Sequence, residues 1–295
     1  MKILVTGATG LLGSTCFCSS ALFPDGEVVG TYHQKTQADY LHLDLCSTDG
    51  PARLLDKINP DIVIHTAAAV NVKFCEENRE VAVATNVTAT AQIAKWCEEN
   101  KSRLIFISSD YVFSGQKDSY SEDDPVDPLN WYGRTKAMGE EAVLREGQNV
   151  VVRVALLYKI CAPVARPTFI QEIQTALEQQ STVEVDDRRV KFPVEVTEVA
   201  LALSGLLNSG IKGVVHFASE KPITRYEWAR QIAGHYDYRS ARVVPLDAVP
   251  DPLLPVRVKL LNNRFASEFS GTKDLLNRFG NFSIGATKST QDYAI

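Results

Sequence analysis

The sequence has few of the residues that build metal sites and disulfide frameworks. Its 295 residues include six cysteines and five histidines. No two cysteines form a C-x-x-C pair, and the histidines stand singly, without the spacing of metal ligands. We therefore predict no metal site and expect reduced, mostly buried thiols.

Long hydrophobic runs and blocks of one charge are also missing. No apolar stretch approaches the roughly 18 residues that cross a membrane, and the opening MKILVTG lacks the apolar core and cleavage site of a signal peptide. The 36 acidic residues outnumber the 31 Lys and Arg, for a net charge of -5. No basic block of about five residues occurs, as nucleic-acid partners would favour. We expect a cytoplasmic protein with neither a membrane nor a nucleic-acid partner.

The chain does contain a regular alternation of short apolar runs and longer helical segments. Its length allows two domains of roughly 150 residues or one large α/β unit. The segment Glu80–Asn100 has helical period, with Val83, Val87, Ala91 and Ala94 near one face. Apolar runs that suit strands covered on both faces occur at Lys2–Thr6, Glu27–Thr31, Asp61–His65, Arg103–Ser108 and Asn149–Val154. The alternation predicts an α/β fold, a Rossmann-type doubly wound parallel sheet.

The regular alternation of apolar runs and helical segments ends after about Leu157. We expect two further helices at Phe169–Gln180 and Tyr226–His235, separated by the charged stretch Asp186–Lys191. Between them, a helix at Thr197–Leu207 and a strand at Gly213–Ala218 are expected to return to the first layer.

The glycine-rich stretch GATGLLG, Gly7–Gly13, directly follows the first strand and opens a helix. Gly7 permits a tight turn, Gly10 lets the backbone approach a pyrophosphate, and Gly13 lets the helix pack closely. The helix N-terminus adds free N–H groups for phosphates. The context predicts a dinucleotide site, the alternative being a glycine turn without a ligand. Further contacts are expected from Thr9, Leu11, Leu12, Asp44, Leu45, Ala67, Ala68, Ala69 and Ser108.

The end of the second strand, GTYHQK, favours one dinucleotide over another. An NAD site usually presents Asp or Glu here to the ribose 2′-OH, but no carboxylate occurs between Thr31 and Gln37. Beside Tyr32, His33 and Lys35 offer donors where a 2′-phosphate would lie. The prediction is NADPH, with NADH as the second candidate; in the alternative interpretation, Lys35 is a solvated loop lysine.

A candidate hydride-transfer centre follows. Tyr132 and Lys136, in NWYGRTK, stand four residues apart and so share one helix face. We predict that Lys136 binds the nicotinamide ribose and depresses the pKa of Tyr132, which exchanges the proton. Ser109, in the stretch ISSDYVFSG at the carboxyl end of the Arg103–Ser108 strand, could donate to a substrate carbonyl. Substrate contacts are also expected from Asp110 and Tyr111, which could instead be a turn carboxylate and a packed aromatic.

Four segments together resemble the dTDP-4-dehydrorhamnose reductase family of extended short-chain dehydrogenases/reductases: GATGLLG, AAAVN, SSDYVFSG and PLNWYGRTKAMGE. The resemblance covers roughly residues 1–160. It implies a catalytic set of Ser109, Tyr132 and Lys136, with Asp110 at the substrate. It also implies hydride transfer from NADPH to a 4-keto nucleotide sugar, with Tyr132 as general acid.

Residues 191–200 (KFPVEVTEVA) and 223–229 (ITRYEWA) resemble another relative, the methionine adenosyltransferase beta subunit, a regulatory protein that binds NADP. An NADP-binding regulatory subunit is therefore an alternative, as is a nucleotide-sugar epimerase or dehydratase on the same scaffold. A homodimer is a further hypothesis. We expect an NADP-binding Rossmann domain over residues 1–157, rejoined by 192–220, and a smaller substrate-binding region from 158–191 and 221–295.

Overall fold

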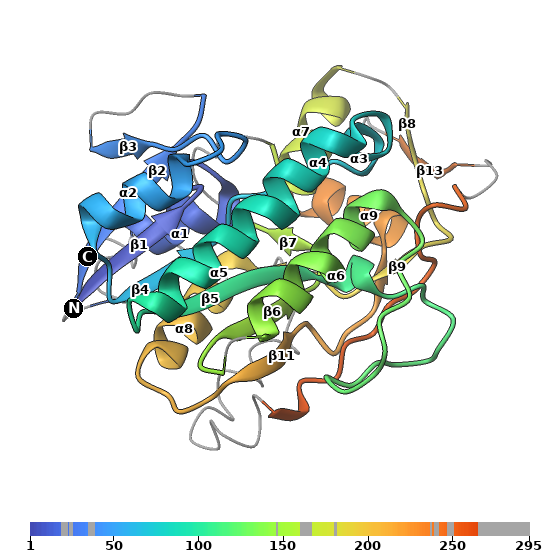
Figure 1. The fold of residues 1–295 in the computed structure, drawn as a ribbon. Coiled ribbons are helices and arrows are strands. Elements are labelled where there is room, and N and C mark those ends of the chain that lie inside the picture. Colours follow the sequence, from blue (N-terminus) through green and yellow to red (C-terminus); the bar gives the residue numbers. More distant parts are fainter. Residues whose placement is uncertain are drawn as a thin grey trace.

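The computed structural model describes residues 1–18, 23, 26–34, 39–145, 147–159, 167–179, 182–236, 238, 242–246 and 251–264. Its centre is a seven-stranded parallel sheet with the strand order β11-β6-β5-β4-β1-β2-β3 (Figure 1). The strands are β1 (Lys2–Thr6), β2 (Glu27–Tyr32), β3 (Tyr40–His42), β4 (Ile62–His65), β5 (Arg103–Ser109), β6 (Val150–Val154) and β11 (Gly213–Phe217). Strands β2 and β3 are added on one side of β1, and β4 and the later strands on the other side. The sheet therefore has a switch point between β1 and β4, which is where such sheets bind ligands.

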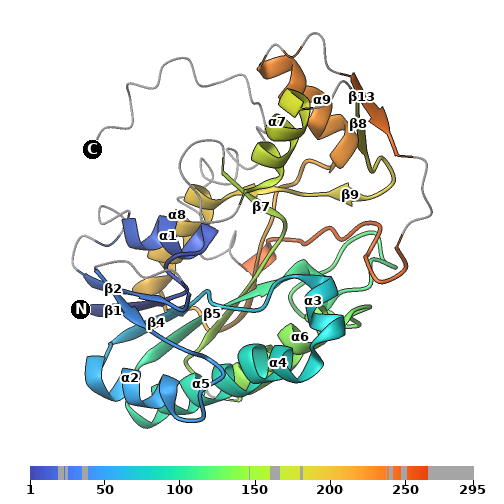
Figure 2. The same cartoon turned by 90° about the horizontal axis from the view of Figure 1, so that it is seen from above.

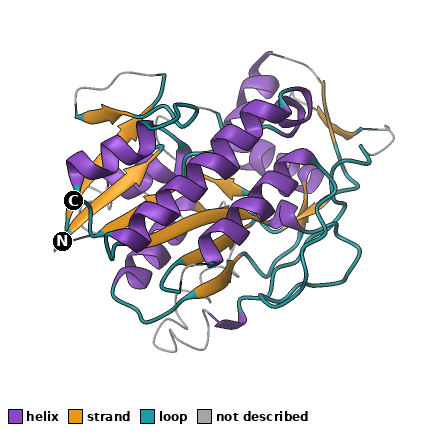
Figure 3. Ribbon diagram, viewed as in Figure 1, coloured by secondary structure: helices purple, strands orange, loops and turns teal. Residues whose placement is uncertain are grey.

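Helices cover both faces of the sheet, as Figure 3 shows with helices in purple and strands in orange. On one side lie α1 (Leu11–Cys18) and α8 (Val196–Leu207), and on the other α2 (Gly50–Ile58), α5 (Ala89–Glu99) and α6 (Trp131–Leu144) (Figure 2). Successive side chains along a strand point to opposite faces of the sheet and pack in different cores. Ile3 and Val5 join the core that contains α1 and α8, whereas Leu4 joins the core of α2 and α5. The continuous apolar strands of the sequence follow from this double coverage.

The expected Glu80–Asn100 helix is present but is interrupted. It consists of α4 (Arg79–Val83), a π-helical turn at Ala84–Thr88 and α5, and α3 (Val72–Glu77) precedes it. Of the residues predicted to lie near one face, Ala94 is buried and Val83, Val87 and Ala91 are half-buried. A regular 3.6-residue period cannot describe a helix that contains a wider π turn, and the buried positions include Ala82, Asn86 and Ile93.

A smaller lobe is built from the second half of the chain. Helices α7 (Phe169–Gln179) and α9 (Arg225–His235) pack around Trp228, with a parallel pair of β8 (Thr182–Val185) and β13 (Arg242–Pro245). Two short pairs connect the lobe to the rest: β7 (Leu157–Tyr158) with β10 (Val194–Glu195), and β9 (Val190–Lys191) with β12 (Ile223–Thr224). The short 3-10 helix η3 (Asp110–Val112) follows β5 directly.

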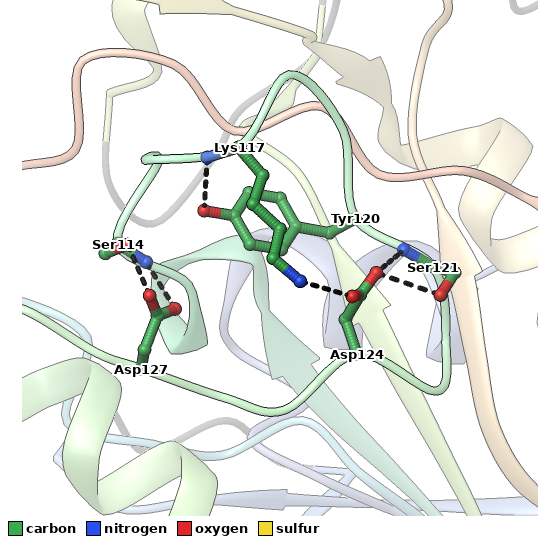
Figure 4. A network of polar contacts seen from close by, with 6 residues as sticks. All are labelled: Ser114, Lys117, Tyr120, Ser121, Asp124 and Asp127. Atoms are coloured by element: carbon green, nitrogen blue, oxygen red, sulfur yellow. Dashed lines mark hydrogen bonds and ion pairs between the residues drawn. The ribbon is translucent and has the colours of Figure 1, made fainter.

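The loop between η3 and α6 is held by its own polar contacts (Figure 4). Asp124 accepts from Lys117 Nζ at 2.6 Å and from the Ser121 amide, while Asp127 accepts from the amide of Ser114 at 2.9 Å. The loop also pairs with the segment 251–264, since the Tyr120 amide donates to Lys259 and the Leu261 amide to Tyr120. These bonds fix the path of the chain into α6.

The predicted α/β class and doubly wound parallel sheet are confirmed. The five strands predicted in the first half begin and end within about one residue of the observed bounds, and the strand expected at 213–218 is β11, beside β6. Among the described cysteines, Cys16, Cys75 and Cys97 are buried and Cys18 and Cys46 are exposed; Cys161, Lys35, Gln180 and the predicted region 265–295 lie outside the described residues. Within the described residues, no helix is long and apolar enough to span a membrane.

Candidate functional site

A cleft of about 700 Å³ lies at the carboxyl ends of the central strands, between the sheet and the smaller lobe. It brings together residues from the loops after β1, β2, β4 and β5, from α6 and from the second half of the chain. Eighteen of the predicted site residues line it: Gly7, Thr9, Gly10, Leu11, Leu12, Gly13, Tyr32, His33, Asp44, Leu45, Ala67, Ala68, Ser108, Ser109, Asp110, Tyr111, Tyr132 and Lys136. Ala69 is not among the lining residues, although its neighbour Val70 is.

The loop after β1 has the close contacts that a phosphate-binding turn requires. Gly7 has a φ of +67°, and a Cβ on it would lie 2.9 Å from Ala67 Cα. A Cβ on Gly13 would lie 2.2 Å from the Gly7 carbonyl oxygen. Only glycine fits either position. The Gly10 amide donates to Gly7 at 2.8 Å and the Ser14 amide to Gly10 at 2.9 Å, so the amides of the first turn of α1, Leu11 to Gly13, precede the first helical hydrogen bond and can face an anion.

A buried network anchors the loop after β4 against β1. His65 Nδ1 lies 2.7 Å from Thr6 Oγ1, and its Nε2 lies 3.1 Å from Thr90 Oγ1. The Thr90 hydroxyl donates its proton to the Asn86 carbonyl, so it must accept from Nε2, and His65 is the neutral Nε2–H tautomer. Burial, followed by the charge of Lys136, lowers the pKa of His65 to about 3. Ala67, whose amide donates to Thr6 Oγ1 at 3.2 Å, and Ala68 follow this network and line the cleft.

The end of β2 presents His33 rather than a carboxylate to the cleft. The nearest acid is Asp44, whose Oδ1 lies 3.7 Å from His33 Nε2 and accepts from the Cys46 amide at 2.9 Å. His33 also stacks on His42, with ring centres 6.1 Å apart. A histidine rather than a carboxylate therefore lines the cleft after β2, where the sequence predicts the contact with the ribose 2′-substituent.

Ser109, Tyr132 and Lys136 converge at the other end of the cleft. Ser109 ends β5, and its hydroxyl donates to Asp110 Oδ1 at 3.1 Å while accepting from the Tyr111 amide. Tyr132 and Lys136 lie on one face of α6, whose first turn is capped by the Asn130 side chain. The Lys136 ammonium lies 3.9 Å from the centre of the Phe106 ring. No acceptor in the described part of the chain is within hydrogen-bond distance of it, which leaves its donors free for a ligand.

Burial controls the protonation of this centre. It raises the pKa of Tyr132; a hydrogen bond with Ser109 opposes the shift, and the charge of Asp110 adds to it. Burial also lowers the pKa of Lys136 to about 7, against the opposing charge of Glu140. The prediction that Lys136 depresses the Tyr132 pKa is wrong for this structure, because desolvation outweighs any effect of the cation. Tyr132 is instead a protonated phenol, which is the form that a proton donor requires.

Asp110 and Tyr111 face a lysine that the sequence analysis did not identify as functional. Lys191, from β9, is 7% exposed and lies 5.1 Å from the centre of the Tyr111 ring. Burial raises the pKa of Asp110, and Lys191 is the largest opposing influence. No described acceptor forms a hydrogen bond or a close ion pair with the ammonium group of Lys191. A buried cation therefore lines the cleft beside the predicted substrate contacts.

The second half of the chain supplies further walls. The cleft is also lined by Phe169 and Glu172 of α7, by Pro167 and Thr168 just before it, and by Arg225 of α9. Residues 154–157, from the end of β6 to the start of β7, line it as well. The guanidinium of Arg225 lies 5.1 Å from the centre of the Phe169 ring. These residues are too far apart in sequence to form a motif. The only available signal was the charge of Lys191 and Arg225 at the edges of expected elements.

A sequence model of the RmlD substrate binding domain family matches residues 1–270. The chain belongs to this family. It is 34% identical over 239 residues to the probable low-salt glycan biosynthesis reductase Agl14 of Haloferax volcanii, covering 79% of each chain. It is also 29% identical over 255 residues to methionine adenosyltransferase 2 subunit beta of Danio rerio, covering 84% of this chain and 78% of that protein.

Solved structures agree with the RmlD-type fold. A hypothetical dTDP-4-dehydrorhamnose reductase from Sulfolobus tokodaii superposes with a TM-score of 0.81 and 28% identity, over 92% of this chain and 95% of that one. Other structures of this fold were determined as complexes with NADP or with NAD. The resemblance noted from the sequence motifs is thus confirmed at the family level, as is the Rossmann-type architecture.

Proposed function

We propose that this protein is an NADPH-dependent oxidoreductase that reduces the carbonyl group of a nucleotide-linked 4-keto sugar. The observation that carries the proposal is the convergence of Ser109, Tyr132 and Lys136 in the same cleft as the glycine loop. Reductases among the similar proteins support the class of reaction. NADH is the second candidate for the cofactor.

The residues present fit a dinucleotide. Gly7 allows the tight turn after β1 and Gly13 the close packing of α1, while Gly10, Ala67 and Ala68 line the cleft without bulky side chains. His33 would contact the 2′-phosphate, while Tyr32, Asp44 and Leu45 would border the adenosine. Lys136 would hold the nicotinamide ribose through its free donors. Bound NADPH supplies the hydride for the reaction.

The side chains of this protein supply the proton and the electrostatic support. Tyr132 is a protonated phenol and donates its proton to the substrate oxygen as negative charge develops there. The Ser109 hydroxyl can turn from Asp110 to that same oxygen and stabilise it. The alcohol product gains the hydride at carbon and the Tyr132 proton at oxygen, and solvent reprotonates the phenolate. Asp110, Tyr111 and Lys191 border the sugar.

The test measures NADPH oxidation with a panel of nucleotide 4-keto sugars, alongside Tyr132→Phe. We expect turnover by the native chain and a loss of about 10²–10⁴-fold in kcat in the variant, with NADPH affinity retained because the phenol ring remains. Equal turnover by the two proteins would contradict the role of Tyr132. Tight NADPH binding with no turnover of any member would contradict the substrate class.

A second candidate is an NADP-binding regulatory subunit, favoured by the 29% identity to the methionine adenosyltransferase subunit. In that case the cleft keeps its cofactor but does no chemistry. A stoichiometric enzyme partner recovered with the native protein, together with no turnover, would favour this candidate. The complete set of Ser109, Tyr132 and Lys136 favours the reductase.

A further inference from the structure

A buried acidic side chain lies directly behind the proposed catalytic residues. Glu140 follows Lys136 by one turn of α6 and is 3% exposed. Its Oε1 accepts from Ser108 Oγ at 2.5 Å and from Arg153 Nε at 3.0 Å, and its Oε2 accepts from Arg153 Nη2 at 2.7 Å. Arg153, on β6, is 4% exposed. Neither residue lines the cleft, so neither can touch a substrate or a cofactor there directly.

The network continues to the C-terminal part of the described chain. Arg153 Nη1 lies 3.2 Å from His216 Nε2, and His216 Nδ1 lies 3.2 Å from the Leu261 carbonyl. Arginine can only donate and a carbonyl can only accept, so His216 is neutral with its proton on Nδ1. Burial lowers the pKa of His216 to about 3, in agreement. The charges of this network are therefore those of Glu140 and Arg153 alone.

Lys136 has few other charges around it. His65 faces it from β4 and is neutral, Phe106 offers only its ring from β5, and Tyr132 on the same helix is protonated. Burial disfavours the ammonium form of Lys136 and Glu140 favours it. Glu140 lies one helical turn from Lys136, and Arg153 bonds to both of its carboxylate oxygens, so a change in either partner alters the electrostatic field at Lys136.

We propose that the Glu140–Arg153 pair is a positioning element of the reductase centre: Glu140 keeps Lys136 charged and orients Ser108, and Arg153 limits the strength of that effect. This inference rests on the proposed function. It assigns a role to two residues that contact neither the substrate nor the cofactor. It also predicts effects of opposite sign for the removal of each partner, which a purely structural ion pair would not produce.

The test is NADPH affinity measured by fluorescence as a function of pH. Affinity should weaken as pH rises through the range in which Lys136 loses its proton. Glu140→Gln removes the favourable charge and leaves Arg153 unopposed, so the midpoint should move down by about one pH unit. Arg153→Gln leaves Glu140 unopposed, so the midpoint should move up. Comparing the variants with one ligand cancels the titration of the ligand's own phosphate.

Two further variants keep the test decisive. Glu141→Gln makes the same chemical change on the same helix at a residue that is 70% exposed and paired with Arg145, and it should leave the midpoint in place. The double variant Glu140→Gln/Arg153→Met replaces the buried pair with neutral groups that the fold tolerates better than one unpaired charge. Its midpoint should fall, because the charge that acts on Lys136 is gone.

An unmoved midpoint in Glu140→Gln, or in the double variant if the single variants do not fold, would overturn the inference. Shifts of both single variants in the same direction would also overturn it. These outcomes differ from failure of the proposed function. A protein with the predicted shifts but no turnover would keep the Lys136 assignment and lose the reductase, whereas turnover with unmoved midpoints would do the reverse.

Discussion

Individual residues in the cleft take their chemical properties from burial more than from their neighbours. Tyr132 and Lys136 share a helix face, yet desolvation favours the neutral form of both side chains. A phenol that keeps its proton suits the donation step in the direction of carbonyl reduction. Oxidation of an alcohol by the same centre would need the phenolate and should therefore be favoured at higher pH.

His33 is the residue on which the cofactor preference can be tested. We predict that His33→Ala lowers the ratio of kcat/KM for NADPH to that for NADH by about tenfold, as expected for one lost hydrogen bond to a charged group. Steady-state kinetics with each cofactor measures this ratio, and His235→Ala, at an exposed position of α9 away from the cleft, is the control. An unchanged ratio would mean that His33 does not contact the 2′-phosphate.

The sequence was most informative where functional residues are close together in the chain. Tyr132 and Lys136 could be paired from their spacing, and Ser109 from its place at the end of an apolar strand. Lys191 and Arg225 could not be paired with them, since only tertiary packing brings these cations to the cleft. The raised pKa of Tyr132 could also not be predicted from the sequence, because the burial of the phenol depends on the whole fold.

Among the elements, the π-helical turn at Ala84–Thr88 connects the loop after β4 with helix α6, which carries Tyr132 and Lys136. Its buried Asn86 accepts from the Ala69 amide at 2.8 Å and donates to the Ala69 carbonyl and to Thr135 Oγ1, each at 3.0 Å. Thr135 is the neighbour of Lys136 on α6. The loop after β4 and the catalytic helix are thus held by one side chain.

Replacing Asn86 should therefore weaken both stability and cofactor binding. We predict that Asn86→Ala lowers the free energy of unfolding by about 2 kcal/mol, because the backbone groups of Ala69 lose their buried partner. It should also weaken NADPH affinity. Denaturant unfolding and cofactor titration measure the two effects. Asn78→Ala, which removes one exposed bond to Phe74, should change both much less, and equal effects of the two substitutions would contradict the role of Asn86.

Strands with continuous apolar sequence were predictable, whereas irregular elements were not. The five predicted strands of the first half match β1, β2, β4, β5 and β6 because burial on both faces leaves a clear pattern. The π turn at Ala84–Thr88 leaves no such pattern, and a regular helical period does not describe the burial around it. The two-residue strands β7, β9, β10 and β12 are too short for a periodic signal.

For the molecule as a whole, the cleft depends on both parts of the chain. The loop after β1 and helix α6 supply the glycines and Tyr132, and β9, from the second half of the chain, supplies Lys191 opposite Asp110. We predict that Lys191→Met raises KM for the carbonyl substrate by about tenfold or more, while NADPH affinity stays unchanged. Initial-rate kinetics and cofactor titration separate the two. A weakened NADPH affinity with an unchanged KM would place Lys191 on the cofactor side instead.

The central claim is that the carbonyl carbon of a substrate receives a hydride while Tyr132 protonates its oxygen. The most direct measurement uses NADPH carrying deuterium at the transferable position of nicotinamide C4, with a nucleotide 4-keto sugar and mass spectrometry of the product. We predict one deuterium on the reduced sugar carbon with the native protein, and loss of the labelled product with Tyr132→Phe although NADPH still binds. No label in any product, or equal labelling by the variant, would contradict the account.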